Sequence, residues 1–136
     1  MSYWLMKEEP AKYSFENLVA DEKTRWDGVK NNLALKHLRA MKKGDRAVFY
    51  ETGKVKSAGG VVEISRGPYP DPDQEDDRLV GVDVKAIKKL DLPVPLADVK
   101  DNKTFASCAL VRIPRLSVMP LNAPEWKTLL KMAGSG

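Results

Sequence analysis

The sequence predicts a single α+β domain over residues 1–136, in which several antiparallel strands have helices before, between and after them. Two observations predict this class. Short apolar or aromatic runs alternate with segments whose apolar residues recur at helical spacing. Turn residues separate these segments, and no internal repeat, low-complexity tract or linker divides the chain. With 43% hydrophobic and 31% charged residues, the chain is suited to one core and a well-solvated surface.

Five runs have the composition of strands: 2–6, 46–50, 58–65, 79–90 and 115–119. In the third run, Gly59-Gly60 indicates a bulge or a close approach of the backbone. Residues 67–73 hold three prolines among acidic residues and are expected to form a turn-rich loop. The segment Asp21–Asp27 is expected to be a polar connection that carries Trp26.

Helices are expected where a capping residue precedes an apolar stripe. Ser14 caps a first short helix, and Asn122 with Glu125 forms a capping box for a C-terminal helix that runs to about Ala133. A central helix over about 32–41 is expected to end with Gly44 as its left-handed cap. Shorter helices or turns are expected at 96–99 and 103–108.

The residue counts exclude most kinds of catalysis. Cys108 is the single cysteine and His37 the single histidine, so an intramolecular disulfide, a thiolate metal cluster and a His-based metal site are all excluded. We expect Cys108 to be a packing residue and His37 an exposed one. We predict no catalytic residue, no metal and no cofactor. The N-terminus lacks the order of a signal peptide and no apolar run approaches the roughly 20 residues of a membrane span, so a cytoplasmic protein is expected.

Charge is distributed unevenly along the chain. Residues 1–56 carry 12 Lys/Arg against 8 Asp/Glu, residues 57–99 carry 5 against 9, and residues 100–136 carry 6 against 2. If the two ends meet in the fold, they form a basic face suited to a phosphate backbone. A mixed, solvated surface is the other interpretation, and charge alone does not separate the two.

Three further patterns lack the features of the functional sites that they resemble. Gly53 and Gly59-Gly60 lack the Gly-Lys-Ser/Thr sequence of a phosphate-binding loop. The acidic loop around Asp71 is interrupted by Pro72 and has no closing glutamate at calcium-loop spacing. Glu8 and Glu9 are adjacent on an extended segment and point opposite ways, which disfavours joint acid–base work.

Trp26 lies outside any periodic core pattern, in the segment Arg25-Trp26-Asp27-Gly28-Val29-Lys30-Asn31. A tryptophan there is placed to stack on a base, a contact worth roughly 1–3 kcal/mol. Asn31 is then placed to read a base edge, while Lys30 or the start of the following helix holds a phosphate. The alternative is a loop tryptophan that folds back onto the core. These residues alone leave both interpretations open.

Five ordered blocks resemble EVE domains. They are Tyr3-Trp4-Leu5-Met6-Lys7-Glu8-Glu9-Pro10, Trp26-Asp27-Gly28-Val29-Lys30-Asn31, Met41-Lys42-Lys43-Gly44-Asp45 with Val48-Phe49-Tyr50, Tyr69-Pro70-Asp71, and Arg115-Leu116-Ser117-Val118-Met119-Pro120. The resemblance covers nearly the whole chain. It implies a PUA-like fold, similar to YTH and ASCH domains: a mixed β pseudo-barrel of about five or six strands flanked by helices.

The resemblance also implies a function: recognition of a modified base, such as 5-methylcytosine, in DNA or RNA by a monomer. Such recognition extrudes the base and then stacks it and bonds its edge. The implied pocket has Trp26 as its stacking wall, Lys7, Glu8 and Glu9 below it, Val29, Lys30 and Asn31 as its far lip, and Tyr50 and Tyr69 nearby. Phosphate contacts are expected from Lys36, Arg39, Lys43 and Arg115.

Two departures from the family pattern concern the ligand. Lys30 stands where the family usually has Arg, which removes a planar, bidentate donor. Glu51 adds a negative charge after the strand tyrosine. Two other functions stay open: a binding module that takes a small molecule or protein in the same pocket, and an enzyme acting on nucleosides or nucleic acid.

Overall fold

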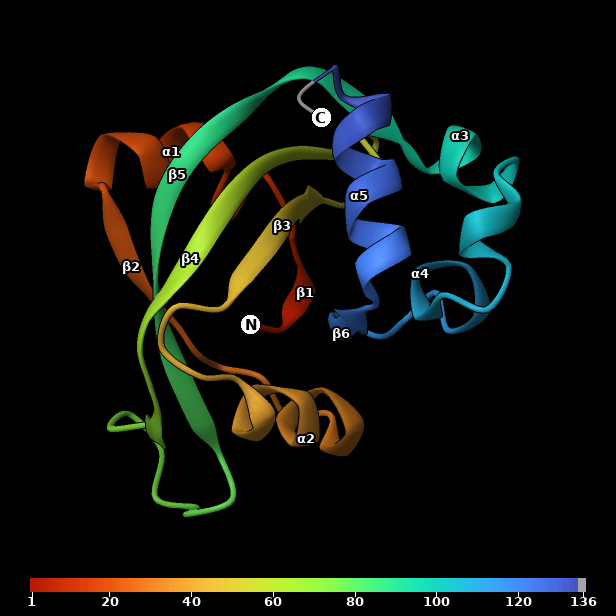
Figure 1. Cartoon of the computed structure of the whole chain (residues 1–136). Coiled ribbons are helices and arrows are strands. Elements are labelled where there is room, and N and C mark those ends of the chain that lie inside the picture. The colour runs from red at the N-terminus through yellow and green to blue at the C-terminus, as the bar shows by residue number, and fades with distance from the viewer. Residues whose placement is uncertain (135–136) are drawn as a thin grey trace.

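The structure is a computed structural model that describes residues 1–134. Its centre is a curled six-stranded sheet in the order β2-β5-β4-β3-β1-β6 (Figure 1). The strands are β1 (Tyr3–Glu8), β2 (Lys23–Trp26), β3 (Arg46–Glu51), β4 (Ser57–Pro70), β5 (Val80–Pro95) and β6 (Val118–Leu121). All neighbours pair antiparallel except β1 and β3, which are parallel. The mixed sheet implied by the family resemblance is confirmed, as are the several antiparallel strands expected from the sequence.

The parallel pair follows from the chain between its two strands. Two helices and β2 separate β1 from β3, which is long enough for a crossover connection. The helices are α1 (Phe15–Asp21), α2 (Asn32–Ala40), α3 (Leu96–Lys100), α4 (Ala109–Arg112) and α5 (Ala123–Met132), and a 3₁₀ turn, η1, lies at Lys103–Phe105. Figure 1 shows α5 and the α3–α4 segment beside one face of the sheet, and α2 across the end of the barrel.

The predicted N-terminal caps are confirmed. The Ser14 side chain accepts from the N–H of Asn17 and that of Asn122 from the N–H of Glu125, each within a complete capping box. The predicted bounds of the central helix agree with the structure to within one residue, but the predicted cap at Gly44 is wrong. The helix ends at Ala40 with Met41 as its cap, and Gly44, at φ 95°, lies in the turn that follows. Asp45 explains this end, because its carboxylate accepts from the Lys42 N–H at 3.0 Å and bends the chain there.

Tertiary pairing gives strand structure to two segments that were predicted to be irregular. Residues 67–70, predicted to be loop, continue β4, because Tyr69 pairs with Gly81 and Pro70 with Val80 of β5. The polar connection predicted at 21–27 contains β2, which pairs with Lys85–Val82 of β5. The last strand begins at Val118, so Arg115 precedes it, and the short helix α4 was not predicted.

Both faces of β1 and β3 are buried. On one face, Tyr3 stacks on Trp126 of α5 with ring centroids 4.5 Å apart. On the barrel side, the Phe49 ring meets the rings of Phe15 and Trp26 edge-on, each at 5.5 Å. Gly60 makes this packing possible, since a Cβ there would lie 2.3 Å from the Phe15 ring. The predicted bulge and close approach at the glycine pair are therefore both present, because the β3–β4 register also shifts there.

Asp45 ties the start of β1 to the turn before β3. It is 5% exposed and accepts from the Trp4 Nε1 at 3.0 Å and from the Ser2 N–H at 3.1 Å. A buried carboxylate with several donors is a strong local constraint. Among the described residues, no helix has the length and apolar character needed to cross a membrane.

Candidate nucleic-acid interface

The Lys7–Pro10 turn is held mainly through its backbone and through the Lys7 amine. The Lys7 N–H donates to the Ser117 carbonyl at 2.8 Å and its Nζ donates to the Pro114 carbonyl at 2.9 Å. The same Nζ lies 5.6 Å from the centroid of the Tyr50 ring. Burial lowers the pKa of Lys7. Lys7 is therefore a half-buried cation that joins β1 to the 113–117 turn.

The two glutamates of this turn lie in different surroundings. Glu8 pairs in register with Glu51 of β3, while its carboxylate accepts from the Glu9 N–H at 2.9 Å. Glu51 accepts from the N–H of Phe15, the first residue of α1, at 3.2 Å. The charge of Glu51 is thus directed at backbone donors at a helix start. Glu9 is exposed, and its carbonyl accepts from the Lys12 and Tyr13 N–H groups.

Trp26 is the last residue of β2, and its side chain is 6% exposed. It pairs with Val82 of β5 and packs edge-on against Phe49. Its carbonyl also lies close to Gly81, where an added Cβ would be 2.9 Å from the Trp26 oxygen. Of the two interpretations that the sequence left open, the structure has the indole packed in the core.

The loop after Trp26 leads to the start of α2. Gly28 has φ 72° and donates its N–H to Asp71 at 3.3 Å. Val29 packs against the core, while Lys30 and Asn31 are exposed. Asn31 caps α2, with its Oδ1 accepting from the Ala34 N–H at 2.9 Å. The Asn31 amide nitrogen is left with donors that the cap does not use.

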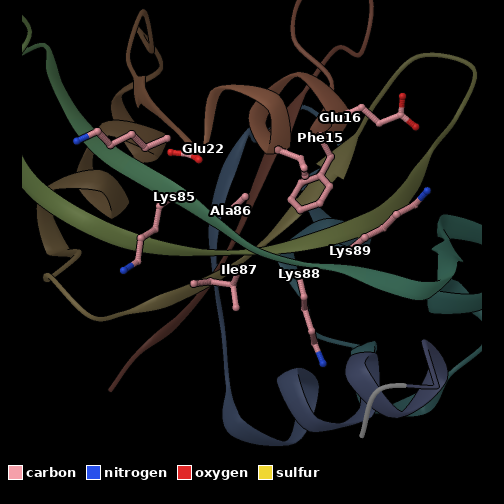
Figure 2. A pocket seen from close by; sticks show the side chains of 10 residues that line it. Phe15, Glu16, Glu22, Lys85, Ala86, Ile87, Lys88 and Lys89 are labelled. Atoms are coloured by element: carbon pink, nitrogen blue, oxygen red, sulfur yellow. The ribbon is translucent and has the colours of Figure 1, made fainter.

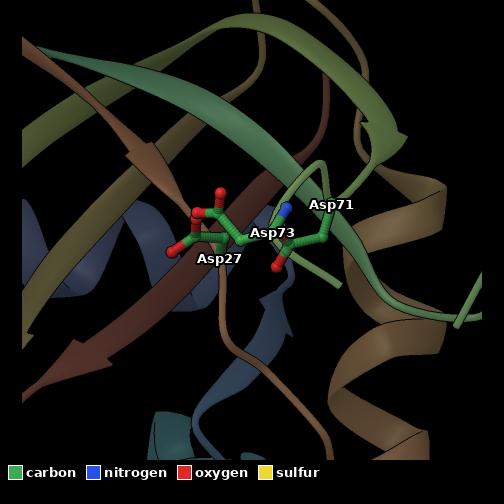
Figure 3. Close-up of side chains that lie close together, drawn as sticks. All are labelled: Asp27, Asp71 and Asp73. Carbon is green, nitrogen blue, oxygen red and sulfur yellow. The ribbon is translucent and has the colours of Figure 1, made fainter. Parts of the chain in front are cut away.

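Asp71, which belongs to the Tyr69-Pro70-Asp71 block but was not predicted to be a site residue, is a structural residue of this loop. It is 2% exposed and also accepts from the Asp73 N–H at 3.0 Å. Figure 3 shows its carboxylate beside those of Asp27 and Asp73, and the three lie within 4.8 Å of one another. Arg25 donates to Asp27 at 2.6 Å and also binds Asp73. Arg25 and the backbone donors thus offset part of the charge of the three carboxylates, and the cluster ties the Tyr69-Pro70-Asp71 segment to the tryptophan loop.

The two predicted tyrosines lie near opposite ends of β4. Tyr50 pairs with Ala58 near the start of that strand; it is buried, and burial raises its pKa. Tyr69 lies near the other end and pairs with Gly81, next to the Trp26–Val82 pair. Its hydroxyl donates to Asp83, and the Arg66 guanidinium lies 4.6 Å from its ring centroid. Burial together with the Asp83 bond raises the pKa of Tyr69 to about 12.

The predicted site residues therefore form two groups. Lys7 and Tyr50 are in register, as are Met6 and Phe49 one position earlier. Because neighbouring residues of a strand point to opposite faces, Lys7 and Tyr50 lie on the face opposite the Phe49–Trp26 contact. The first group is Lys7, Glu8, Glu9 and Tyr50. The second is Trp26, Val29, Lys30, Asn31 and Tyr69.

The ends of the chain meet, as the basic-face interpretation requires. β1 pairs with β6, and α2 packs against β6. Lys36, Lys43 and Arg115 are exposed, as is Arg39, whose guanidinium donates to the Arg78 carbonyl. A hollow of about 370 Å³ is lined by Leu33 and His37 of α2 and by residues of the 107–125 segment, which places the chain around Arg115 beside α2.

Cys108 and His37 have the surroundings of packing residues. Cys108 is 3% exposed, and burial raises its pKa to about 11, which keeps the thiol protonated at neutral pH. His37 is half-buried rather than exposed as predicted, because its ring lies 6.1 Å from that of Trp4. Burial, with a smaller contribution from Lys36, lowers the pKa of His37.

A curled mixed sheet with a crossover between β1 and β3 and a basic helix at its end defines a PUA-like α+β domain. The family model of the EVE domain matches residues 2–132. Human thymocyte nuclear protein 1 is 32% identical over 96% of this chain and 73% of its own length. The chain therefore belongs to the EVE domain family.

Solved structures agree closely with this assignment. Rpa0253 from Rhodopseudomonas palustris is 43% identical, with a TM-score of 0.94 over 98% of this chain and 94% of that one. The human THYN1 protein in complex with 5-methylcytosine-containing DNA is 30% identical, with a TM-score of 0.90 over 98% of each chain.

Proposed function

We propose that this chain is a non-catalytic DNA-binding protein that recognises a modified base such as 5-methylcytosine. The observation that carries the proposal is the match, over 98% of the chain, to the human protein in complex with 5-methylcytosine-containing DNA. We assign the binding site to the motif residues around Trp26 and Lys7. We further propose that the chain acts as a monomer in the cytoplasm.

The loop from Gly28 to Asn31 is the proposed entrance for the base. Trp26 is almost fully buried directly before this loop, so we assign its indole to the inner wall of the pocket rather than to an open stacking platform. Lys30 and Asn31 are exposed beside it. The free amide donors of Asn31 match the acceptors on the pairing edge of a cytosine. Opening the loop by a small movement would bring an extruded base onto the indole.

Phosphate contacts are proposed on the adjoining surface, from Lys36, Arg39, Lys43 and Arg115. Each lysine or arginine that neutralises a phosphate releases a counterion, so the affinity falls steeply with salt. We expect the Lys36→Gln/Lys43→Gln variant to reduce the slope of log K against log salt by about 2, from a slope of about 0.9 for each contact in duplex DNA. A slope unchanged by this double variant would remove these two residues from the interface.

The test of base recognition uses fluorescence anisotropy with matched oligonucleotides that carry cytosine or 5-methylcytosine at one position. The decisive variant is Asn31→Ser, because serine keeps a side-chain oxygen for the cap but has no amide to read a base. Asn122→Ser makes the same change at the cap of α5 and is the matched control. We expect Asn31→Ser to lower the preference for 5-methylcytosine at least tenfold, and Asn122→Ser to leave it unchanged.

Two results would contradict the proposal. Equal affinity of the wild-type protein for both oligonucleotides would exclude recognition of the modified base. Equal effects of the two serine variants would exclude the role assigned to Asn31. Trp26→Phe, checked by thermal melting to be folded, tests the inner wall, and an unchanged preference in that variant would exclude the indole from recognition. The same oligonucleotides made as RNA distinguish the two kinds of nucleic acid.

A further inference from the structure

A hollow of about 720 Å³ lies between α1 and the middle of β5, and none of the residues that line it belongs to the family blocks (Figure 2). Its apolar lining comes from Phe15 and Val19 of α1 and from Ala86 and Ile87 of β5. A hollow of this size with a mainly apolar lining and a few polar groups has the character of a small-molecule site. The side chains of Val19 and Ile87 are 51% and 37% exposed, which is high for apolar residues.

The floor of this hollow is rigid. The Phe15 ring packs edge-on against Phe49, and Gly60 leaves the space that the ring occupies. The Phe15 N–H is held by Glu51 at 3.2 Å. On the opposite wall, the Ala86 N–H donates to the Glu22 carbonyl at 3.0 Å, which fastens β5 to the end of α1. Figure 2 shows Phe15 and Ala86 facing each other at the centre of the hollow.

Two irregularities of the backbone shape the walls. The β4–β5 register shifts between Val61–Lys88 and Val62–Ala86, so Ile87 is an extra residue that has no partner on β4. Such a bulge re-aims the side chains beside it. Glu22, at φ 69°, is a non-glycine residue in a left-handed conformation where α1 ends. Strained residues of this kind often lie at binding sites.

The rim of the hollow is basic. Lys23, Lys85, Lys88 and Lys89 line it, together with Glu16 and Glu22. Lys85 is paired with Glu63 at 3.0 Å, whereas within residues 1–134 no carboxylate lies at ion-pair distance from the other three lysines. Figure 2 shows the amines of Lys85, Lys88 and Lys89 extending from β5 in different directions and the Glu16 carboxylate turned away from Phe15. Of the unpaired lysines that the figure labels, Lys89 lies on the same side of β5 as Phe15, whereas Lys88 extends to the other side.

We infer that this hollow binds a small organic anion with an apolar body, such as a single-chain carboxylate, sulfate or phosphate. The apolar part would cover Val19 and rest on Phe15 and Ala86 beside Ile87, which recovers free energy by removing exposed apolar surface from water. The head group would be held by the amine of Lys89, which lies on the Phe15 side of β5, and the positive charge of Lys88 would add to the attraction at this edge. Lysines on an exposed strand next to a bulge also prevent that strand from pairing with another chain. This role does not explain the apolar hollow beside them.

The test follows the methyl resonances of Val19, Ala86 and Ile87 by ¹H–¹³C NMR while sodium decanoate is added below its micelle concentration. Decanol supplies the apolar body without charge, and inorganic phosphate supplies the charge without the body. We expect saturable shifts with decanoate, at least tenfold weaker binding of decanol, and no shift of these methyl groups with phosphate. Equal binding of decanol, or shifts that never saturate, would overturn the inference.

Charge variants distinguish binding in the hollow from non-specific attraction to the positive surface. Lys88→Glu/Lys89→Glu should weaken decanoate binding at least tenfold. Lys127→Glu/Lys131→Glu makes the same charge change on exposed residues of α5 and should leave binding unchanged. Val19→Trp is designed to fill the hollow from an exposed position, and its thermal melt establishes that it is folded. Equal weakening by both charge variants, or undiminished binding to Val19→Trp, would remove the site.

Discussion

Trp26 and Lys7 belong to the two motifs that a sequence resemblance would assign to one pocket, yet their surroundings differ sharply. Trp26 is 6% exposed and packs on Phe49 within the barrel. Lys7 is half-buried on the other face of β1, where its amine binds the Pro114 carbonyl. The first is fixed by packing and the second by a polar contact near the surface. Residues that a family motif groups together are thus divided here between core and surface.

This difference separates two ways in which a site residue contributes. A buried indole is positioned by its neighbours, so removing it damages the fold as well as any ligand contact. A lysine held by one carbonyl is replaceable at little cost in stability. Loss of DNA binding in a Trp26 variant therefore says little until its stability is known, whereas the same loss in a Lys7 variant is direct.

The largest expected effect is that of Trp26→Ala on stability. Removing a buried aromatic side chain leaves a cavity beside Phe49, so the free energy of unfolding should fall by about 3–5 kcal/mol. Lys7→Met keeps the length and apolar stem but loses one hydrogen bond to a carbonyl, at a cost within about 1.5 kcal/mol. Urea unfolding followed by circular dichroism measures both. Similar losses for the two variants would refute the contrast between core and surface.

The next effect concerns Asp71, which holds the tryptophan loop. Asp71→Ala removes the buried carboxylate that accepts from the N–H groups of Gly28 and Asp73, and the loss of two hydrogen bonds should cost about 1–3 kcal/mol in the same urea experiment. Asp77→Ala, at an exposed residue of the same acidic segment, is the control and should change stability by less than about 0.5 kcal/mol. If both variants unfold alike, Asp71 is not the residue that anchors the loop.

Much of the fold was accessible from the sequence because local signals and tertiary packing agree. The capping boxes at Ser14 and Asn122 correctly predicted where two helices begin, and the apolar stripe of α2 correctly predicted which face of that helix is buried. The errors lie where distant pairing overrides local preference. Prolines at 68 and 70 predict a loop, yet β5 pairs with that segment and draws it into β4. A polar run at 21–27 likewise becomes β2 because β5 offers a free edge.

The site was less accessible, since its geometry depends on contacts between residues far apart in the chain. The sequence singled out Trp26, Lys30 and Asn31 but could not choose between an open and a buried indole. The structural role of Asp71 was not predicted because its acidic neighbours indicated a solvated loop, although the turn places its carboxylate at the Gly28 N–H. The hollow beside α1 had no sequence signal either, because Phe15 and Ala86 meet only through the curl of the sheet.

A smaller effect on stability should distinguish Tyr69 from Tyr50. Tyr69→Phe loses the bond to Asp83 and should cost about 0.5–1.5 kcal/mol, whereas no hydrogen bond to the Tyr50 hydroxyl is seen within residues 1–134, so Tyr50→Phe should cost less. Because the folded pKa of Tyr69, about 12, lies above its ordinary value of 10, its contribution is complete below pH 10 and is lost as the pH rises towards 12. The difference between the two variants should therefore shrink over that range in urea unfolding, and a constant difference would contradict the Asp83 assignment.

The smallest expected effect is a change in the pKa of His37, a residue of α2 whose ring lies 6.1 Å from that of Trp4. Because it is the single histidine, one imidazole resonance reports its pKa by NMR. Burial disfavours the imidazolium, so we expect a value below 6.5, and Lys36→Gln should raise it by removing a nearby positive charge. With a folded pKa below the unfolded one, the contribution to stability is present above pH 6.5 and is lost as the pH falls through the folded value. Lys127→Gln, on α5, should leave the resonance unmoved. A pKa at or above 6.5 would mean that the imidazole is solvated, and the end of α2 would then be looser against β1 than the ring contact with Trp4 implies.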